Sequence, residues 1–177
     1  MNRRLPVLIV LAAVALASCQ TLSGPRMGDT VESFETSNKT FRLRVDRHAE
    51  VGGFMAVLNG AYYVFRSAPV GSDNWHDIMT FRHDDPNQIP RDQVRFVNER
   101  VGFVFMGWMY AVSTDGGATW TVWDAHRDLK SQCCNYGLVQ DVHLETDGTG
   151  TMSLHVIPDR GEVPKLRTND YGRHWFV

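Results

Sequence analysis

From residue 40 to the C-terminus, apolar residues alternate with polar ones or stand in short runs, as in residues 41–46 (FRLRVD) and 101–106 (VGFVFM). Gly, Asn, Asp and Pro separate these stretches at close intervals, and no useful length of the chain has the apolar period of a helix. Alternation over about 4 to 8 residues between turn residues is typical of β-strands. The pattern therefore predicts a single all-β domain over residues 40–177.

The N-terminal residues have a different pattern. Arg3 and Arg4 precede an apolar run, residues 5–16, which has the length of a secretory signal and is too short for a transmembrane helix. Residues 20–39 (QTLSGPRMGDTVESFETSNK) contain few apolar residues and many Ser, Thr and Gly. We therefore expect a signal peptide over residues 1–18 and a flexible, lipid-anchored tether over residues 19–39.

The end of the signal resembles the lipobox of bacterial lipoproteins, because Leu16, Ala17 and Ser18 stand directly before Cys19. The resemblance implies that the Cys19 sulfur is acylated and that this residue becomes the mature N-terminus. An ordinary signal peptide with an incidental cysteine is the alternative. Gln20, rather than an aspartate, follows the cysteine, which in Gram-negative lipoproteins implies the outer membrane. The resemblance thus predicts a protein that faces the periplasm and touches the membrane only through its lipid.

The charge balance narrows the classes of partner. The chain has 18 Lys and Arg against 20 Asp and Glu, a net charge of −2 with His neutral. Removing a signal that contains Arg3 and Arg4 makes the mature protein more acidic. Nothing in this balance indicates a nucleic-acid partner. Residues 19–177 are enough to bury one core, so one domain is expected.

Three segments of the body align as repeats: residues 41–67, 94–114 and 138–168. Each has a strand, a polar turn, a glycine, and two further strands, the last of which arrives at a hydroxyl residue. Gly53, Gly102 and Gly150 are 49 and 48 residues apart, which is the period of a four-stranded β-unit. Propellers normally need about four blades to close. Three propeller-blade-like antiparallel units therefore predict an incomplete propeller with sheets packed face to face, or a β-sandwich.

Two octets at corresponding places of the repeat resemble the Asp box, or BNR repeat, whose pattern is Ser/Thr-x-Asp-x-Gly-x-x-Trp. The matching residues are Ser113, Asp115, Gly117 and Trp120 in the first octet, and Thr168, Asp170, Gly172 and Trp175 in the second. Residues 67–75 (SAPVGSDNW) form a degenerate third copy. The box occurs in sialidase propellers, in photosystem assembly factors and in other folds. The resemblance therefore implies a local structure and not an activity.

The chemistry of the box predicts a hairpin that satisfies its own polar groups. Asp115 and Asp170 can accept hydrogen bonds from backbone N–H groups of their own turn, and the hydroxyl residues can join them. Gly117 and Gly172 suit positive φ. The tryptophans can cover the turn with apolar surface. A ligand site in the box is the alternative.

No catalytic set stands out. A sialidase needs a complete propeller with an arginine cluster, a tyrosine nucleophile and acids at its centre, and this chain is too short to build one. The seven histidines are scattered, so a zinc site is not indicated. The chain has neither a nucleophile elbow nor a phosphate loop. We expect a protein that is not an enzyme and has no metal or cofactor.

Cys133 and Cys134 are adjacent in a compartment predicted to be oxidising. They can close a strained vicinal disulfide, bond to another molecule, or remain free thiols. A vicinal disulfide would stiffen the loop over residues 126–137.

The segment from Cys133 to Trp175 resembles the C-terminal part of lipoproteins that serve as immunity proteins against lipase effectors of type VI secretion systems. The resemblance rests on the lipobox, the Cys-Cys-Asn-Tyr run and the terminal box. It implies a protein that binds and neutralises a cognate secreted phospholipase in the periplasm. The alternative is an envelope binding or assembly module that recognises a glycan or another envelope protein.

Contact with a protein partner is expected from exposed loops and aromatic side chains. The candidates are the loop over residues 124–136, with Asn135 and Tyr136, and the segment that carries Trp108 and Tyr110. The alternative for Trp108 and Tyr110 is a core position in a central strand.

Overall fold

The computed structural model of the chain describes residues 24–52, 60–84, 88–89, 91–129, 138–155 and 165–177. In these ranges the chain forms 11 strands in three antiparallel sheets, with two short helices. The sheets do not close into a barrel. The all-β prediction is confirmed, and the architecture agrees with an incomplete propeller or a sandwich.

The first sheet has the order β1-β2-β3-β4, with β1 at Arg26–Ser37, β2 at Phe41–Val51, β3 at Ala61–Pro69 and β4 at His76–His83. Asn38 makes the tight turn between β1 and β2, because its side-chain oxygen accepts hydrogen bonds from the backbone N–H groups of Thr40 and Phe41. The start of β2 alternates between buried apolar residues and half-buried arginines. One face of this sheet is therefore apolar and the other is charged.

The second sheet has the order β5-β6-β7-β8. The 3-10 helix η1 (Arg91–Gln93) leads into β5 (Val94–Phe96), which is followed by β6 (Gly102–Met106), β7 (Met109–Ser113) and β8 (Thr121–Asp124). Every residue of β6 is buried. Strands covered on both faces have continuous apolar runs instead of alternation, which accounts for the sequence of residues 101–106. The short helix α2 (Ala125–Asp128) follows β8.

The third sheet has three strands in the order β11-β10-β9. They are β9 (Val139–Leu144), β10 (Gly150–Leu154) and β11 (Lys165–Thr168). At the position of a fourth strand, Phe176 forms a two-hydrogen-bond bridge with Arg167 of β11, with N···O distances of 2.7 and 3.0 Å. The third unit is thus shorter than the other two.

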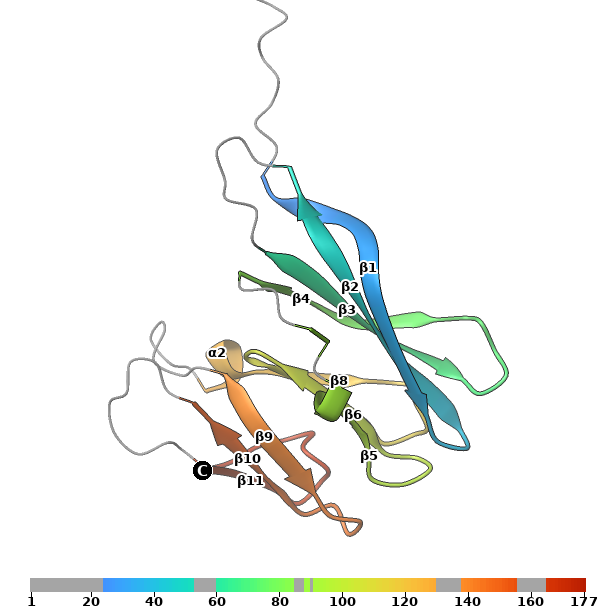
Figure 1. Ribbon diagram of the computed structural model, residues 1–177. Helices are drawn as coiled ribbons and strands as arrows, with labels where there is room; N and C mark the ends of the chain where they lie inside the picture. The colour runs from blue at the N-terminus through green and yellow to red at the C-terminus, as the bar shows by residue number, and fades with distance from the viewer. Residues whose placement is uncertain (1–23, 53–59, 85–87, 90, 130–137, 156–164) are drawn as a thin grey trace, which may run out of the picture.

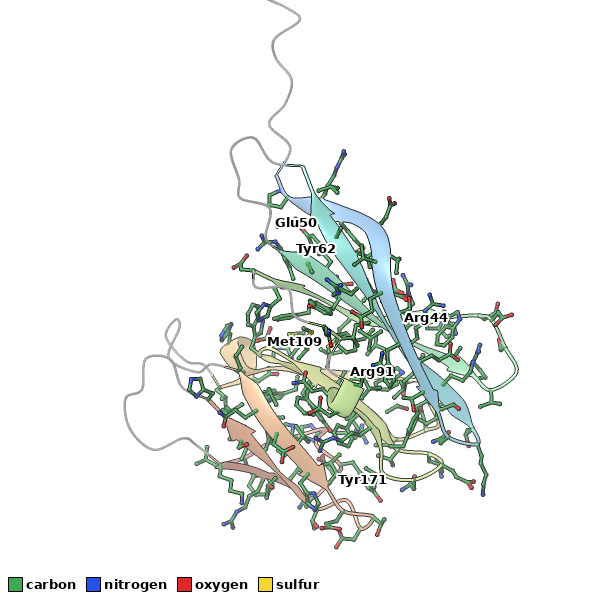
Figure 2. The ribbon with its side chains drawn as sticks, viewed as in Figure 1. Arg44, Glu50, Tyr62, Arg91, Met109 and Tyr171 are labelled. Carbon is green, nitrogen blue, oxygen red and sulfur yellow. The ribbon has the colours of Figure 1, made fainter. Side chains whose placement is uncertain are left out.

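The second sheet lies between the first and the third, so the domain is a stack of three layers (Figure 1). Side chains fill the two spaces between the layers (Figure 2). The core between the first and second sheets contains Phe41, Leu43, Val45, Tyr63, Phe65, Phe81, Val104, Met106 and Ala111. The core between the second and third sheets contains Phe103, Phe105, Tyr110, Val112, Trp123, Val142, Met152, Leu154 and Leu166.

The prediction of a flexible tether over residues 19–39 is wrong from Arg26 onward, because Arg26–Ser37 is strand β1. This strand lies at the edge of its sheet and buries little. Its polar side chains pair with β2 instead: Ser33 donates a hydrogen bond to Asp46, and Glu32 forms an ion pair with Arg47 at 3.1 Å. Cross-strand polar pairs stabilise a sheet without leaving an apolar pattern in the sequence. A prediction based on the composition of residues 19–39 therefore missed strand β1.

The strand also changes the alignment of the first repeat. Residues 41–51 form the second strand of their unit and not the first, while β6 and β10 do begin at Gly102 and Gly150 as the repeat predicts. Gly53 lies outside the described residues. In the first two units the box, or its degenerate copy, joins the third strand to the fourth.

Candidate functional site

The box at residues 113–120 forms a closed hydrogen-bond network in the β7–β8 turn. The Ser113 hydroxyl donates to Asp115 Oδ1 at 2.9 Å and accepts from the Gly117 N–H at 2.8 Å. Asp115 also accepts from the backbone N–H of Thr119 at 2.9 Å and from its hydroxyl at 2.6 Å. The box therefore uses its own polar groups to fold its turn, as the sequence predicts.

The box at residues 168–175 repeats this geometry after β11. Thr168 Oγ1 donates to Asp170 Oδ1 at 2.8 Å and accepts from the Gly172 N–H at 2.8 Å. Asp170 accepts from the His174 N–H at 3.0 Å, and its Oδ2 lies 2.6 Å from His174 Nδ1. His174 thus takes the place that Thr119 holds in the other box.

Both box carboxylates are held in the ionised form. Burial alone would raise the pKa of Asp115, but the hydrogen bonds from Thr119 and Ser113 outweigh it and leave the pKa below its ordinary value. Burial is likewise outweighed at Asp170, where the hydrogen bonds from His174 and Thr168 lower the pKa. Carboxylates committed to their own turn are poor general acids or bases.

Two successive residues in each box have positive φ. Gly116 and Gly117 have φ of 80° and 85°, and Tyr171 and Gly172 have φ of 62° and 80°. The box pattern predicts the second position only. Tyr171 is held in this conformation by two hydrogen bonds, from its backbone N–H to Gly148 and from its hydroxyl to Thr146.

The boxes also join neighbouring units. Trp120 Nε1 donates to Ser67 Oγ at 2.9 Å, and Ser67 occupies the hydroxyl position of the degenerate copy in the first unit. A Cβ at Gly117 would lie 2.7 Å from the ring of Phe41 in β2. In the next pair of units, the Tyr110 hydroxyl donates to the Tyr171 carbonyl at 2.9 Å. Each box is therefore packed against the preceding unit, a role that sequence reasoning missed.

Trp175 differs from Trp120 in one respect. Its Nε1 is buried and has no hydrogen-bond partner among the described residues. The corresponding hydroxyl of the preceding unit is that of Ser113, which is committed to its own box. In the first unit, Pro69 stands where a box has aspartate, so Ser67 has no aspartate of that kind to bond. Trp120 Nε1 also lies 3.2 Å from the Gly117 carbonyl of its own box, so the two box tryptophans differ in whether their indole N–H has an acceptor among the described residues.

The predicted partner contacts fall into three groups. Tyr110 is fully buried, so its prediction as a direct contact is wrong, and the core alternative holds for it. Trp108 is half-buried and stacks on His126 of α2, with ring centroids 4.9 Å apart. Asn135 and Tyr136 lie outside the described residues, as do Cys133, Cys134 and the lipidation candidate Cys19.

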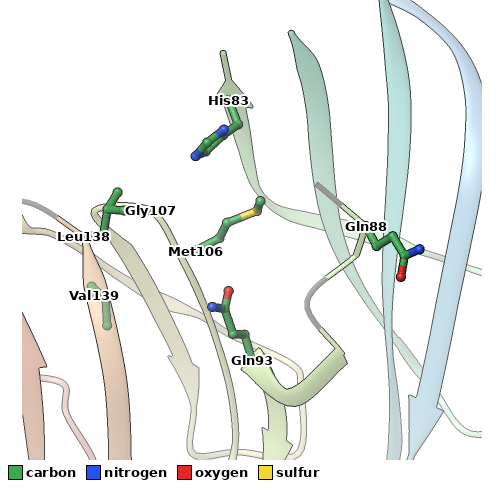
Figure 3. Close-up of a pocket in the computed structure, with 7 residues that line it drawn as sticks. All are labelled: His83, Gln88, Gln93, Met106, Gly107, Leu138 and Val139. Carbon is green, nitrogen blue, oxygen red and sulfur yellow. The ribbon is translucent and has the colours of Figure 1, made fainter. Parts of the chain in front are cut away.

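A small cavity of about 170 Å³ lies where the three units meet (Figure 3). The side chains that line it come from the end of β4, from η1, from the β6–β7 turn and from the start of β9. They are His83, Gln88, Gln93, Met106, Gly107, Leu138 and Val139. Met106 lies between His83 and Gln93 in Figure 3. Among the described residues, the lining has polar groups but no Asp, Glu, Lys or Arg.

A larger hollow of about 310 Å³ lies beside the third box. We call it the β8–α2 groove. It is lined by Val122, Trp123, Arg127, Asp128, Arg173, His174 and Trp175. One wall comes from β8 and α2 of the second unit, and the other comes from the box of the third unit. The first wall includes the described part of the loop over residues 124–136 in which we expect a partner contact.

The second-unit wall of the groove is fixed by local bonds. Asp124 caps α2 by accepting from the N–H groups of His126 and Arg127. The Arg127 guanidinium contacts both oxygens of Asp128 at 2.7 Å and donates to the Val122 carbonyl at 2.9 Å. The pair lowers the pKa of Asp128 and raises that of Arg127. Both residues are therefore charged, and they neutralise each other.

The third-unit wall differs from the second-unit wall in how its charged side chains are paired. The Arg173 side chain has no partner among the described residues, and His174 is bonded to Asp170. Arginine and tryptophan are the residue types that contribute most to protein interfaces. The pattern of the box fixes Trp175 but leaves positions 173 and 174 variable. Sequence reasoning therefore missed Arg173. It is identified only because it lines the same groove as Arg127 in the folded protein.

Among the described residues, no group of three or more His, Cys, Asp and Glu side chains is arranged to hold a metal ion. Within the same residues, no helix has the length and apolar character needed to cross a membrane.

No protein-family model matches the chain, and searches of the curated proteins and of the solved structures return no similar protein.

Proposed function

We propose that this protein is a periplasm-facing lipoprotein that binds and neutralises a phospholipase effector of a type VI secretion system. The observation that carries the proposal is the β8–α2 groove. It joins Trp175 and two arginines, and its arginine-bearing helix belongs to the loop where partner contact is expected. The lipobox and the Cys-Cys-Asn-Tyr run support the same function through their resemblance to immunity lipoproteins.

The internal bonding of the boxes supports a binding function over a catalytic one. The Asp115 and Asp170 carboxylates accept hydrogen bonds from groups of their own turns. Each box also packs against the preceding unit. Inhibition would then come from shape and charge complementarity on a scaffold that needs little reorganisation.

Strand β1 limits how far this scaffold can move from the membrane. If Cys19 carries the lipid, residues 20–25 alone separate it from Arg26, the first residue of the sheet. At a maximum of about 3.6 Å per residue, that segment spans about 20 Å. The domain would therefore work close to the membrane surface that a phospholipase attacks.

The experiment that tests the proposal is a toxicity rescue. If the gene next to this one encodes a lipase, that lipase is directed to the periplasm of a test bacterium, with and without this protein; the absence of a lipase gene there would contradict the proposal. We expect rescue by the full-length protein, rescue by a variant carrying Cys133→Ser and Cys134→Ser, and no rescue after deletion of residues 1–18. Failure of the full-length protein to protect, when it accumulates in the periplasm, would contradict the proposal.

One observation favours the second candidate, an envelope module that binds a glycan. A sugar site is expected to group aromatic side chains around one polar hollow, and Trp123 and Trp175 both line the β8–α2 groove. Trp123 is only 6% exposed, however, which leaves little ring surface for stacking on a sugar. Binding of oligosaccharides by the purified protein, without any protein partner, would favour this candidate.

A further inference from the structure

We infer that the β8–α2 groove receives an acidic side chain from a surface loop of the partner protein, with the carboxylate on the Arg173 guanidinium. This inference rests on the proposed function, since it names the chemistry by which the partner is held. The carbon atoms of the acidic residue would lie against the indole of Trp175.

The charges of the groove carry the inference. Of its two arginines, Arg127 is neutralised by Asp128, whereas the side chain of Arg173 has no partner in the described part of the chain. Asp170, the carboxylate nearest to Arg173 in sequence, is committed to Thr168 and His174. Among the described residues, the groove therefore has one guanidinium without a carboxylate partner. A guanidinium presents a planar set of donors that matches a carboxylate in a bidentate pair.

Local contacts hold the walls of the groove in place. Trp175 packs edge-on against the buried ring of Tyr110, with centroids 5.5 Å apart, and α2 is fixed by its cap. Binding of a ligand would therefore cost this protein little conformational entropy. The volume of about 310 Å³ is sufficient for one or two side chains and not for a folded element. We therefore assign the groove to the tip of a loop.

The test measures binding of the lipase from the rescue experiment to the purified protein by calorimetry, at two ionic strengths. The variants are Arg173→Ala and Arg173→Glu, with Arg167→Glu as the matched control. Arg167 is exposed and lies on β11 with its side chain on the outer face of the same unit, because Leu166 and Thr168 on either side of it are buried. Thermal unfolding of each variant checks that it folds.

We expect Arg173→Ala to weaken binding by about 10- to 100-fold, as for loss of a charge-assisted pair. Arg173→Glu should weaken it further, and an acid-to-lysine substitution on the lipase should restore affinity for Arg173→Glu. Arg167→Glu should bind as the parent protein does. Binding of the lipase that is unaffected by either change at Arg173 would overturn this inference and leave the proposed function intact.

Two other outcomes separate the remaining possibilities. If the parent protein does not bind the lipase, the proposed function fails, and this inference fails with it. If it binds oligogalacturonate instead, in a manner that depends on Arg173, the groove recognises a carboxylate on a glycan, and the assignment to a protein loop is overturned.

Discussion

Trp120 and Ser67, which are 53 residues apart in sequence, are joined by a hydrogen bond of 2.9 Å from the indole Nε1 to the hydroxyl Oγ. The bond ties the box of the second unit to the unit that lacks a complete box. In the degenerate copy, Pro69 stands in the place of the box aspartate, and the Ser67 hydroxyl accepts from Trp120 instead. This side-chain bond joins two layers of the stack.

This hydrogen bond predicts that substitutions of the two box tryptophans lower the free energy of unfolding by different amounts. Trp120→Phe removes a paired donor and should lower the free energy of unfolding by about 1 kcal/mol more than Trp175→Phe does. Trp175→Phe removes a buried donor that has no partner, which offsets part of its packing loss. Urea unfolding of both variants measures the difference. Equal losses would show that the Trp120–Ser67 bond contributes nothing.

Alanine substitutions at two turn glycines, Gly172 and Gly71, provide a second matched comparison of stability. Gly172 and Gly71 have nearly the same φ, 80° and 81°. A Cβ at Gly172 would lie 2.6 Å from both the Trp175 ring and the Tyr110 hydroxyl, whereas a Cβ at Gly71 meets nothing within 4 Å.

Gly71→Ala should therefore cost about 1–2 kcal/mol of unfolding free energy, from backbone strain alone. Gly172→Ala should cost about 1–3 kcal/mol more, because the ring of Trp175 must move. Denaturant midpoints check the order, and a Gly172→Ala variant as stable as Gly71→Ala would contradict the packing of the third box on the second unit.

The box carboxylates predict a pH dependence of stability. The pKa values of Asp115 and Asp170 are below their ordinary value in the folded protein. The stability that they contribute is therefore fully present above the unfolded-state pKa of about 3.9, and it is lost as the pH falls through the lower folded-state values.

Asp115→Asn should reduce the slope of stability against pH in this acidic range and leave the slope near pH 7 unchanged. Asp29→Asn, in the exposed edge strand β1, is the control, since Asp29 has no side-chain bond of this kind among the described residues. Unfolding curves between pH 7 and pH 3 provide the measurement. Parallel curves for Asp115→Asn and the parent protein would refute the prediction.

Strand β1 predicts where the chain can be shortened. A protein that begins at Gly24 should fold like the mature protein, because the sheet begins at Arg26. A protein that begins at Asn38 loses β1, and with it the hydrogen bond from Ser33 to Asp46, a residue with no exposed surface. We expect the shorter protein to lose about 3 kcal/mol or more. Circular dichroism during thermal unfolding distinguishes this result from that expected of a flexible tether, for which the two proteins would be equally stable.

The sequence by itself determined the class of the fold and the local form of the boxes. Alternation of apolar residues specifies strands, and a turn whose aspartate, hydroxyl and glycine bond within eight residues needs no distant partner to be predicted. The spacing of Gly102 and Gly150 also matched the starts of β6 and β10, the second strands of two units, whereas Gly53 lies outside the described residues.

Only the tertiary structure decided the rest. Strand β1 was hidden because an edge strand is held by cross-strand polar pairs, which have no period along the chain. The burial of Tyr110 follows from a sheet covered on both faces. The β8–α2 groove combines Arg127 with Arg173, residues of different units, and its charge depends on which guanidinium already has a partner. Such pairing depends on which side chains the fold brings close together, so a pattern along the sequence does not reveal it.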